Sequence, residues 1–294
     1  MQTLVSIAVV TYNSARTVLE TLNSIKMQTY PNIELIISDD CSTDNTVEVC
    51  REWLEQNKEQ FARTEIIAVE KNTGVAGNCN RADLACKGEW IKMIAGDDLL
   101  MPNCVQDCMT YAKKHPDVVY LFAMVMPFSD DGVNRKKVEI PFNYDFFKMS
   151  TTDQYNYLIF ERNEVPAPSA FYNSLKVRQL GIKCDERIPM MDDWPKWVNL
   201  LKKGVRFHFL DEPLVMYRVD EQSISHSSTP SKAYIHSLAL FYLYYQHEEF
   251  WKKDKLLAIK KYINAKKQLN DNLFWKIANR GIKAIYKKIR HEQE

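Results

Sequence analysis

Short apolar runs alternate with amphipathic stretches through the first third of the chain. Four runs rich in Val and Ile have the length of buried strands: 5–10, 33–38, 65–69 and 90–95. Apolar residues recur at helical spacing in the stretches between them: 14–28, 42–56 and 74–86. Alternating strands and helices predict an α/β fold with a mostly parallel, Rossmann-like sheet flanked by helices.

The pattern is less regular in the middle of the chain. Residues 127–150 are typical of a loop or a β-ribbon, and residues 165–172 of an extended segment around prolines. Two acids open a predicted helix at 191–204 and Lys-Lys-Gly ends it, which suits the helix dipole and the C-cap. Two more strands are predicted at 205–210 and 213–219.

Polar residues gather where three of the predicted strands end. These groups are Thr11-Tyr12-Asn13, Asp39-Asp40 and Asp97-Asp98. Ligands of such sheets lie outside the carboxyl ends of the strands, so three polar groups at one edge indicate one site. Paired carboxylates suit a hard cation, Mg²⁺ or Mn²⁺, whose other ligands are water and phosphate. Taken alone, the pair Asp97-Asp98 is more typical of a solvated turn than of a metal site.

Composition places few further limits on the protein. Its 294 residues are 46% hydrophobic and 26% charged, as in an ordinary globular protein. Seven cysteines occur without CxxC spacing, so we expect reduced thiols in a cytoplasmic protein. We see no signal peptide and no apolar window long enough to span a membrane.

Four segments resemble, in order, family 2 of the glycosyltransferases, whose fold is GT-A. They read "VSIAVVTYNSARTVLETLNSIKMQTYPNIELIISDDCSTDNT", "NTGVAGNCNRADLACKGEWIKMIAGDD", "MDDWPKWVNLLKKG" and "DEPLVMYRVDEQSIS". The resemblance covers about residues 4–226. It implies a GT-A domain at 1–228, with a nucleotide-binding half (1–100) and an acceptor half (101–228), before a helical C-terminal extension at 229–294.

The resemblance also implies roles for single residues. On the donor side, nucleotide-sugar contacts are expected from Thr11, Tyr12, Asn13, Asp40, Arg81 and Asp97. Asp98 is expected to ligate Mn²⁺ or Mg²⁺ in the DXD-type motif of the family. Asp193 is expected to be the general base of an inverting transfer, with Asp192 and Trp194 on the acceptor side. Asp192 either orients the site or caps the helix.

Some positions depart from the family pattern. Asp220 stands where many relatives carry a metal-binding His, so Asp220, or His226, is the expected third ligand. Cys79 stands where some relatives carry Arg, so a phosphate contact is either lost there or taken over by Arg81.

The function implied is transfer of a sugar from a nucleoside diphosphate sugar, expected to be a UDP-sugar, to a hydroxyl of a glycan or lipid-linked glycan, as in polysaccharide biosynthesis. A nucleotidyltransferase is one alternative, but its usual Gly-rich phosphate loop is absent after the first strand. A non-catalytic scaffold subunit that binds nucleotide sugar is the other. No nucleic-acid partner is expected, because the main body is acidic.

The C-terminal part of the chain is strongly basic. Residues 251–294 hold 13 Lys or Arg and 4 Asp or Glu, whereas the other 250 residues hold 26 and 34. Cations recur along one stripe of a predicted helix at 273–294: Lys276, Arg280, Lys283, Lys287 and Arg290. This pattern predicts either a surface helix packed on the domain or a peripheral contact with anionic lipid at the inner face of the cell membrane.

Overall fold

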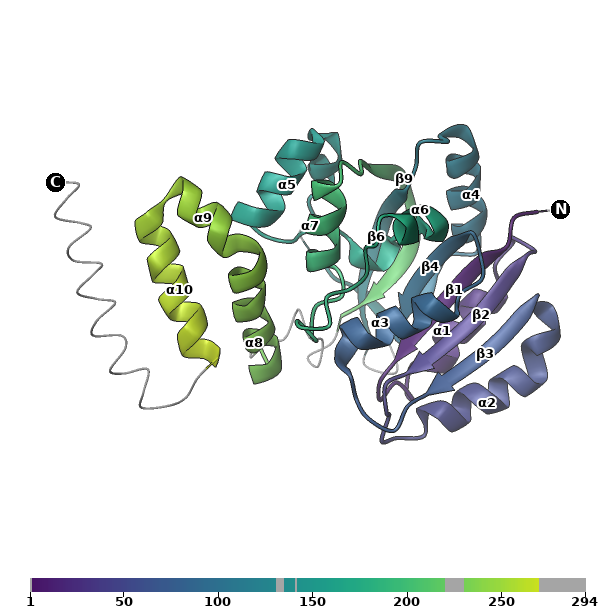
Figure 1. The fold of residues 1–294 in the computed structure, drawn as a ribbon. Coiled ribbons are helices and arrows are strands. Elements are labelled where there is room, and N and C mark those ends of the chain that lie inside the picture. Colours follow the sequence, from purple (N-terminus) through teal and green to yellow (C-terminus); the bar gives the residue numbers. More distant parts are fainter. Residues whose placement is uncertain (1, 131–134, 141, 220–229, 270–294) are drawn as a thin grey trace.

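The computed structural model describes residues 2–130, 135–140, 142–219 and 230–269. A single sheet runs through it in the order β3-β2-β1-β4-β8-β6-β9-β5, with β7 paired to β6 (Figure 1). The strands of the first half are β1 (Val5–Thr11), β2 (Ile33–Asp39), β3 (Arg63–Ala68) and β4 (Trp90–Ala95). Those of the second half are β5 (Leu99–Leu100), β6 (Tyr120–Asp130), β7 (Arg135–Lys137), β8 (Phe171–Asn173) and β9 (Phe207–Arg218).

The first four strands are parallel, as the alternation of strands and helices predicts. Thr11 of β1 pairs with Asp39 of β2, and Val10 pairs with Ala95 of β4. The three polar groups that follow these strands therefore lie at the same edge of the sheet.

Helices cover both faces of the sheet. The side chains of each strand point alternately to the two faces, so apolar side chains need cover on both. Val5, Ile7 and Val9 point to one face, and Ala8 points to the other. The first face is covered by α1 (Val18–Lys26), α2 (Thr46–Asn57) and α4 (Cys104–Lys114). The second is covered by α3 (Gly74–Ala85), α5 (Thr151–Phe160), α6 (Ser174–Gln179) and α7 (Trp194–Lys202).

Two predicted helices begin later than expected. The segment predicted to be helical from residue 14 becomes α1 only at Val18, and the one predicted from residue 42 becomes α2 only at Thr46. The Ser42 backbone N–H and hydroxyl both donate to Asp39, at 2.8 and 2.5 Å. Ser42 therefore closes a turn on the strand end, and this competes with helix formation.

The two strands predicted at 205–210 and 213–219 form one strand, β9. It pairs in parallel with β6 and changes register twice, opposite Ala123–Val125. The acidic pair Asp211-Glu212 and Pro213 look like a strand break in the sequence, but the irregular register absorbs them. The segment predicted as a loop or ribbon at 127–150 contains the end of β6 and its hairpin partner β7.

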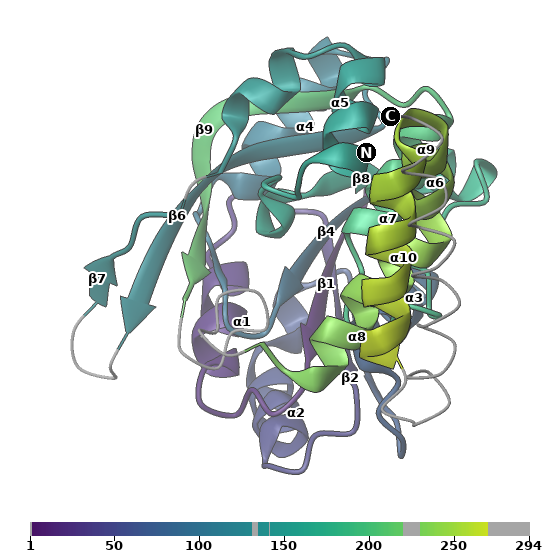
Figure 2. The same ribbon diagram turned by 90° about the vertical axis from the view of Figure 1, so that its left-hand side faces the viewer.

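The C-terminal helices are α8 (Lys232–Phe241), α9 (His247–Lys253) and α10 (Lys255–Leu269). Helices α8 and α9 lie beside α5 and α7, and α10 packs against α8 and α9 (Figure 1, Figure 2). Phe241 contacts Trp194 with ring centroids 4.4 Å apart, and Phe250 contacts Phe160 at 5.1 Å. Within the part of the chain that the structure describes, no helix is long and apolar enough to cross a bilayer. The basic helix predicted at 273–294 lies outside the described residues, and the division of the chain at residue 228 stays a prediction.

Candidate active site

The end of β1 presents three polar residues in a constrained turn. The Thr11 hydroxyl is buried and donates to Asp39 Oδ1 at 2.8 Å. Asn13 adopts a left-handed backbone with φ of 52°, which Asn tolerates better than most residues. Its side-chain oxygen accepts from the Thr43 backbone N–H at 2.8 Å. The turn leaves the Tyr12 ring 51% exposed at the sheet edge, where a planar base can stack on it.

The two acids at the end of β2 point in different directions. Asp39 accepts from Thr11 and Ser42 and so stabilises the loop that follows. The Asp40 backbone N–H donates to Thr11 O at 3.0 Å, which holds Asp40 against β1. Cys41 then takes a left-handed backbone with φ of 67°, and the chain leaves the sheet there.

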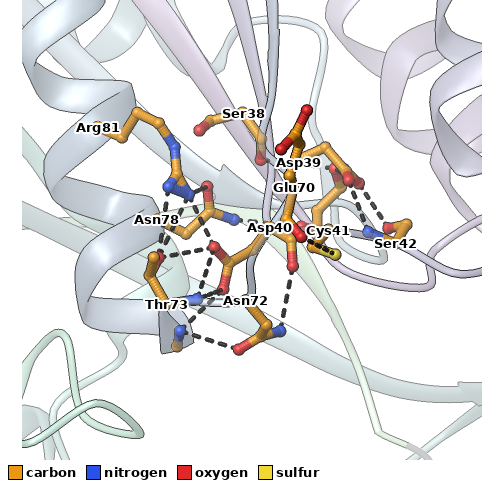
Figure 3. A network of polar contacts seen from close by, with 12 residues as sticks. Ser38, Asp39, Asp40, Cys41, Ser42, Glu70, Asn72, Thr73, Asn78 and Arg81 are labelled. Carbon is orange, nitrogen blue, oxygen red and sulfur yellow. Dashed lines mark hydrogen bonds and ion pairs between the residues drawn. The ribbon is translucent and has the colours of Figure 1, made fainter.

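Asp40 is buried, and several donors from α3 and the turn before it surround its carboxylate (Figure 3). Its oxygens accept from the Thr73 and Gly74 backbone N–H groups at 2.9 and 2.8 Å. The Thr73 hydroxyl and Arg81 Nη2 also donate to it, each at 2.7 Å. These donors use the acceptor capacity of one carboxylate. The structure thus pairs Asp40 with Arg81, two residues that the family resemblance assigns to the nucleotide-sugar donor.

Asp98 follows β4 in a buried position. Its neighbour Gly96 is required by close packing, because a Cβ there would lie 2.8 Å from the Thr11 methyl group. Burial raises the pKa of Asp98 well above its usual value, and the charge of Asp97 raises it further. Asp98 Oδ1 accepts from the Arg218 backbone N–H at 2.9 Å.

Arg218 is a site residue that the sequence analysis did not identify. Its Nε donates to the Asp97 backbone oxygen at 2.9 Å, and its guanidinium pairs with Asp130 at 2.8 Å and Glu20 at 3.1 Å. The side chain is 4% exposed and also lies over the Phe128 ring. In the sequence it is only a cation after the apolar residues 213–217, which does not indicate its partners. Arg218 anchors the segment that carries the acid pair.

The residues after β4 fit a hard dication. The described residues contain no group of three or more His, Cys, Asp or Glu side chains able to hold a metal alone. Such a dication, however, usually takes one or two carboxylates and completes its shell with water and phosphate. The raised pKa of Asp98 shows that burial disfavours its negative charge, which a cation would stabilise. The other expected ligands, Asp220 and His226, lie outside the described residues.

A second pair of carboxylates precedes α7. Asp193 caps this helix, since its Oδ1 accepts from the Trp194 backbone N–H at 2.6 Å. Of the two alternatives for Asp192, helix capping is excluded, because its carboxylate accepts from Cys79 Sγ of α3 at 3.6 Å. Its role in orienting the site stays a prediction. Asp193 Oδ2 accepts from Asn163 at 2.9 Å, a second contact that the sequence analysis missed.

The protonation equilibrium of Asp193 is shifted from that of an ordinary aspartate. Burial raises its pKa to about 7, and the neighbouring charge of Asp192 contributes to the increase. Burial also raises the pKa of Asp192. Trp194 donates its indole N–H to Leu158 O at 2.9 Å and packs on Phe241. Its role on the acceptor side stays a prediction.

Helix α3 connects the two acidic regions. Its first turn binds Asp40, and the Ala76 backbone N–H donates to Pro189 O at 3.1 Å, three residues before Asp192. Cys79, one turn further on, contacts Asp192 itself. Helix α3 thus contacts both the end of β2 and the segment that carries the acid pair.

Asp193→Asn should stabilise the protein in a pH-dependent way. An aspartate whose pKa is higher in the folded than in the unfolded state lowers the free energy of unfolding. The effect begins at a pH of about 4, where the aspartate ionises in the unfolded chain. This loss of stability grows as the pH rises to the folded-state pKa of about 7 and is constant above it. Because the side chain is partly exposed, we expect a gain of about 2 kcal/mol at pH 8 and none near pH 4. Urea unfolding across pH measures it, and Asp145→Asn, at a carboxylate whose side chain is 78% exposed, is the control.

Comparison with known proteins relates this arrangement to sugar transfer. An uncharacterised glycosyltransferase of Methanocaldococcus jannaschii, MJ1057, is 25% identical over 276 residues, which cover 93% of this chain and 84% of that protein. The glucosyltransferase WfaP of Escherichia coli, named for transfer from UDP-Glc to a GlcNAc-diphosphoundecaprenol, is 28% identical over 76% of this chain and 80% of its own.

The fold also has solved counterparts. The mannosyltransferase PcManGT from Pyrobaculum calidifontis, solved with GDP-Man and Mn²⁺, superposes with a TM-score of 0.58 at 17% identity. The match covers 99% of this chain and 83% of that one, so the predicted GT-A fold is confirmed. The family model described as Glycosyl transferase family 2 matches residues 6–172, more than half of the chain. The chain belongs to this family and is a glycosyltransferase.

Proposed function

We propose that this glycosyltransferase moves a sugar, with inversion and with a divalent metal, from a nucleoside diphosphate sugar to a hydroxyl of a glycan or lipid-linked glycan. One observation supports the proposal: α3 contacts both the buried Asp40 at the carboxyl edge of the sheet and Asp192, the neighbour of Asp193. This arrangement holds a donor site and a base on one scaffold.

Asp193 is the proposed base. With a pKa of about 7, it is partly ionised at neutral pH and still basic enough to take the proton of an acceptor hydroxyl. Asn163 and the Trp194 N–H orient its carboxylate. Attack by the acceptor oxygen in a single displacement inverts the anomeric centre.

Asp98, supported by Asp97, is the proposed metal ligand. A bound Mn²⁺ or Mg²⁺ supplies positive charge that stabilises the leaving diphosphate. Arg218 fixes the backbone of this acid pair, so the carboxylates have a defined position before any ligand arrives.

The proposed nucleotide is UDP, with Thr11, Tyr12, Asn13 and Asp40 around the base. WfaP supports a UDP-sugar by its name, whereas the solved mannosyltransferase holds GDP-Man. Thr73, Gly74 and Arg81 already donate hydrogen bonds to Asp40, so an imide N–H of the base has to replace one of them. Of these three groups, the Arg81 guanidinium is the one carried by a long side chain. If the base replaced it, this cation would be available to the diphosphate.

The two alternatives, a nucleotidyltransferase and a scaffold subunit, predict different behaviour. From a nucleotide sugar, a glycosyltransferase releases nucleoside diphosphate, a nucleotidyltransferase supplied with pyrophosphate releases nucleoside triphosphate, and a scaffold releases neither. Turnover of a panel of UDP- and GDP-sugars, with and without pyrophosphate, therefore separates the three functions.

Asp98→Ala should abolish the Mn²⁺ dependence of nucleotide binding. Removing the carboxylate removes the proposed protein ligand, while the fold survives because neighbouring strands hold the segment. Thermal shifts of the protein with UDP and GDP, with and without Mn²⁺, measure the effect, since a ligand of the native state raises Tm. Asp145→Ala is the control. Mn²⁺-dependent shifts that survive in Asp98→Ala would disprove its role.

Asp193→Asn should separate chemistry from binding. The amide keeps the shape and the helix cap but cannot accept a proton, so kcat should fall by ~10²–10⁴-fold. The affinity for the nucleotide should stay within about twofold of the unchanged protein. An equal loss of nucleotide affinity would instead make Asp193 a donor or metal ligand.

The basic segment at 273–294 should bind anionic membranes, which suits a lipid-linked acceptor. Each cation near an anionic surface contributes ~1 kcal/mol, and salt screens the attraction. The full chain should co-sediment with phosphatidylserine-containing liposomes at low salt and be released at high salt. Changing Lys276, Arg280, Lys283, Lys287 and Arg290 to Gln should abolish this and leave nucleotide binding intact. If the full chain stays in solution at low salt, the segment has no membrane role.

A further inference from the structure

Two acids and two arginines form a closed cycle of ion pairs beside the turn that follows β4. Arg218 pairs with Asp130 at 2.8 Å and with Glu20 at 3.1 Å. Arg135 pairs with the same two carboxylates, with Asp130 at 3.3 Å. Each acid uses one oxygen for both arginines, Oδ2 of Asp130 and Oε2 of Glu20. In this ion-pair cycle, every charge therefore lies between two charges of the opposite sign.

The ion-pair cycle joins parts of the chain that are far apart in sequence. Glu20 is in the first turn of α1, Asp130 ends β6, Arg135 begins β7 and Arg218 ends β9. The hairpin of β6 and β7 extends outward from the sheet (Figure 2). Both guanidinium groups lie over the Phe128 ring of this hairpin, 4.7 and 5.4 Å from its centre. The cycle thus connects the hairpin to α1 and to the end of β9.

Arg218 connects the ion-pair cycle to the proposed metal ligand. Its Nε donates to the Asp97 backbone oxygen, and its backbone N–H donates to Asp98 Oδ1, both at 2.9 Å. The second contact is the one hydrogen bond that the described residues donate to the Asp98 carboxylate. Arg218 therefore holds the turn at two points, the Asp97 carbonyl and the Asp98 carboxylate.

The two acids determine how the Arg218 guanidinium is oriented. The side chain is 4% exposed, so its charge needs compensation inside the protein. Nη1 donates to Asp130 and Nη2 donates to Glu20, and these two contacts fix the plane of the group. Because Nε lies in the same plane, they also fix the direction of its hydrogen bond to Asp97. Without the Glu20 carboxylate, one side of the fork loses its partner.

We propose that Glu20 is a positioning residue for the metal site: through the Arg218 guanidinium it holds the Asp97-Asp98 turn in the conformation that binds the dication. The inference rests on the proposed role of Asp98 as metal ligand. Residues that orient metal ligands usually contribute ~10–100-fold to metal affinity. Glu20 acts through one further residue, so we expect the lower end of this range, about tenfold.

A purely structural role makes a different prediction. If the ion-pair cycle only ties the hairpin to α1, loss of Glu20 lowers the free energy of unfolding and leaves the Mn²⁺ affinity of the folded protein unchanged. If Glu20 acts through Arg218, the affinity falls. This loss then disappears once Arg218 itself has been changed, because the two residues belong to one network.

The Mn²⁺ affinity of the folded chain tests the inference without turnover. Electron paramagnetic resonance of free Mn²⁺ measures the Kd in saturating UDP, or in GDP if only GDP raises Tm. Glu20→Gln keeps the size and removes the charge, and should raise the Kd about tenfold. Glu48→Gln is the matched control and should leave the Kd unchanged. Glu48 is likewise the third residue of a helix, α2, and shares the favourable interaction with the helix dipole.

Arg218→Lys tests the route of the effect. A lysine keeps the charge but lacks the planar fork, so it cannot donate to both acids and to Asp97 at once. The Kd should rise at least as much as in Glu20→Gln. Adding Glu20→Gln to Arg218→Lys should then change the Kd by less than about twofold. If Arg218→Lys does not fold, Asp130→Asn takes its place.

The possible failures are distinguishable. An unchanged Kd in Glu20→Gln, or equal changes in Glu20→Gln and Glu48→Gln, would overturn the inference, as would full additivity of the two changes in the double variant. The proposed metal ligand fails in another way: the unchanged chain binds no Mn²⁺, or Asp98→Ala binds it as tightly as the unchanged chain. Either of these results would overturn both proposals.

Discussion

The buried carboxylate of Asp40 determines how the site is assembled. It joins the end of β2 to the first turn of α3 through the Thr73 and Gly74 N–H groups. A buried charge is tolerated only when donors surround it, so this contact fixes α3 relative to the sheet. Gly74 then allows the close approach of the next loop, because its φ is +80° and a Cβ would lie 2.6 Å from Pro189 O. The acid pair before α7 takes its position from that approach.

Carboxylates that are fully or partly buried fall into two classes in this protein. Glu34 accepts from Ser6, Arg63 and the backbone of Lys87 and Gly88, and these donors lower its pKa although burial acts to raise it. Asp98 and Asp193 have fewer donors, and burial raises the pKa of both. Fully bonded acids stabilise the scaffold. Incompletely compensated acids retain an affinity for a cation or a proton, which is the property that the proposed chemistry requires.

The parts of the fold that follow from local periodicity are visible in the sequence. The parallel strands β1 to β4 and the polar groups at their ends are of this kind, because burial on both faces demands continuous apolar runs. The positions of Asp97-Asp98 and Asp192-Asp193 at element ends could also be predicted, since acids favour such places. Their chemical roles came from family resemblance.

Contacts between distant segments are not visible in the sequence. Arg218 is 120 residues from Asp98, and nothing in its own strand indicates that contact. The pairing of Asp40 with Arg81 and the burial of Lys196 against β6 and β8 arise only once the sheet order is known. Strand β9 is a further example. The residues Asp211-Glu212-Pro213 indicate a break between two strands, but pairing with β6 keeps the segment in one irregular strand.

Anomalous diffraction at the manganese edge tests the central claim most directly. Crystals of the full chain grown with Mn²⁺ and UDP should show a manganese peak beside the Asp98 carboxylate, with the nucleotide base against Tyr12 at the end of β1. A bound nucleotide with no manganese peak, or a peak remote from Asp98, would contradict the account of the strand-end acids as the donor and metal site.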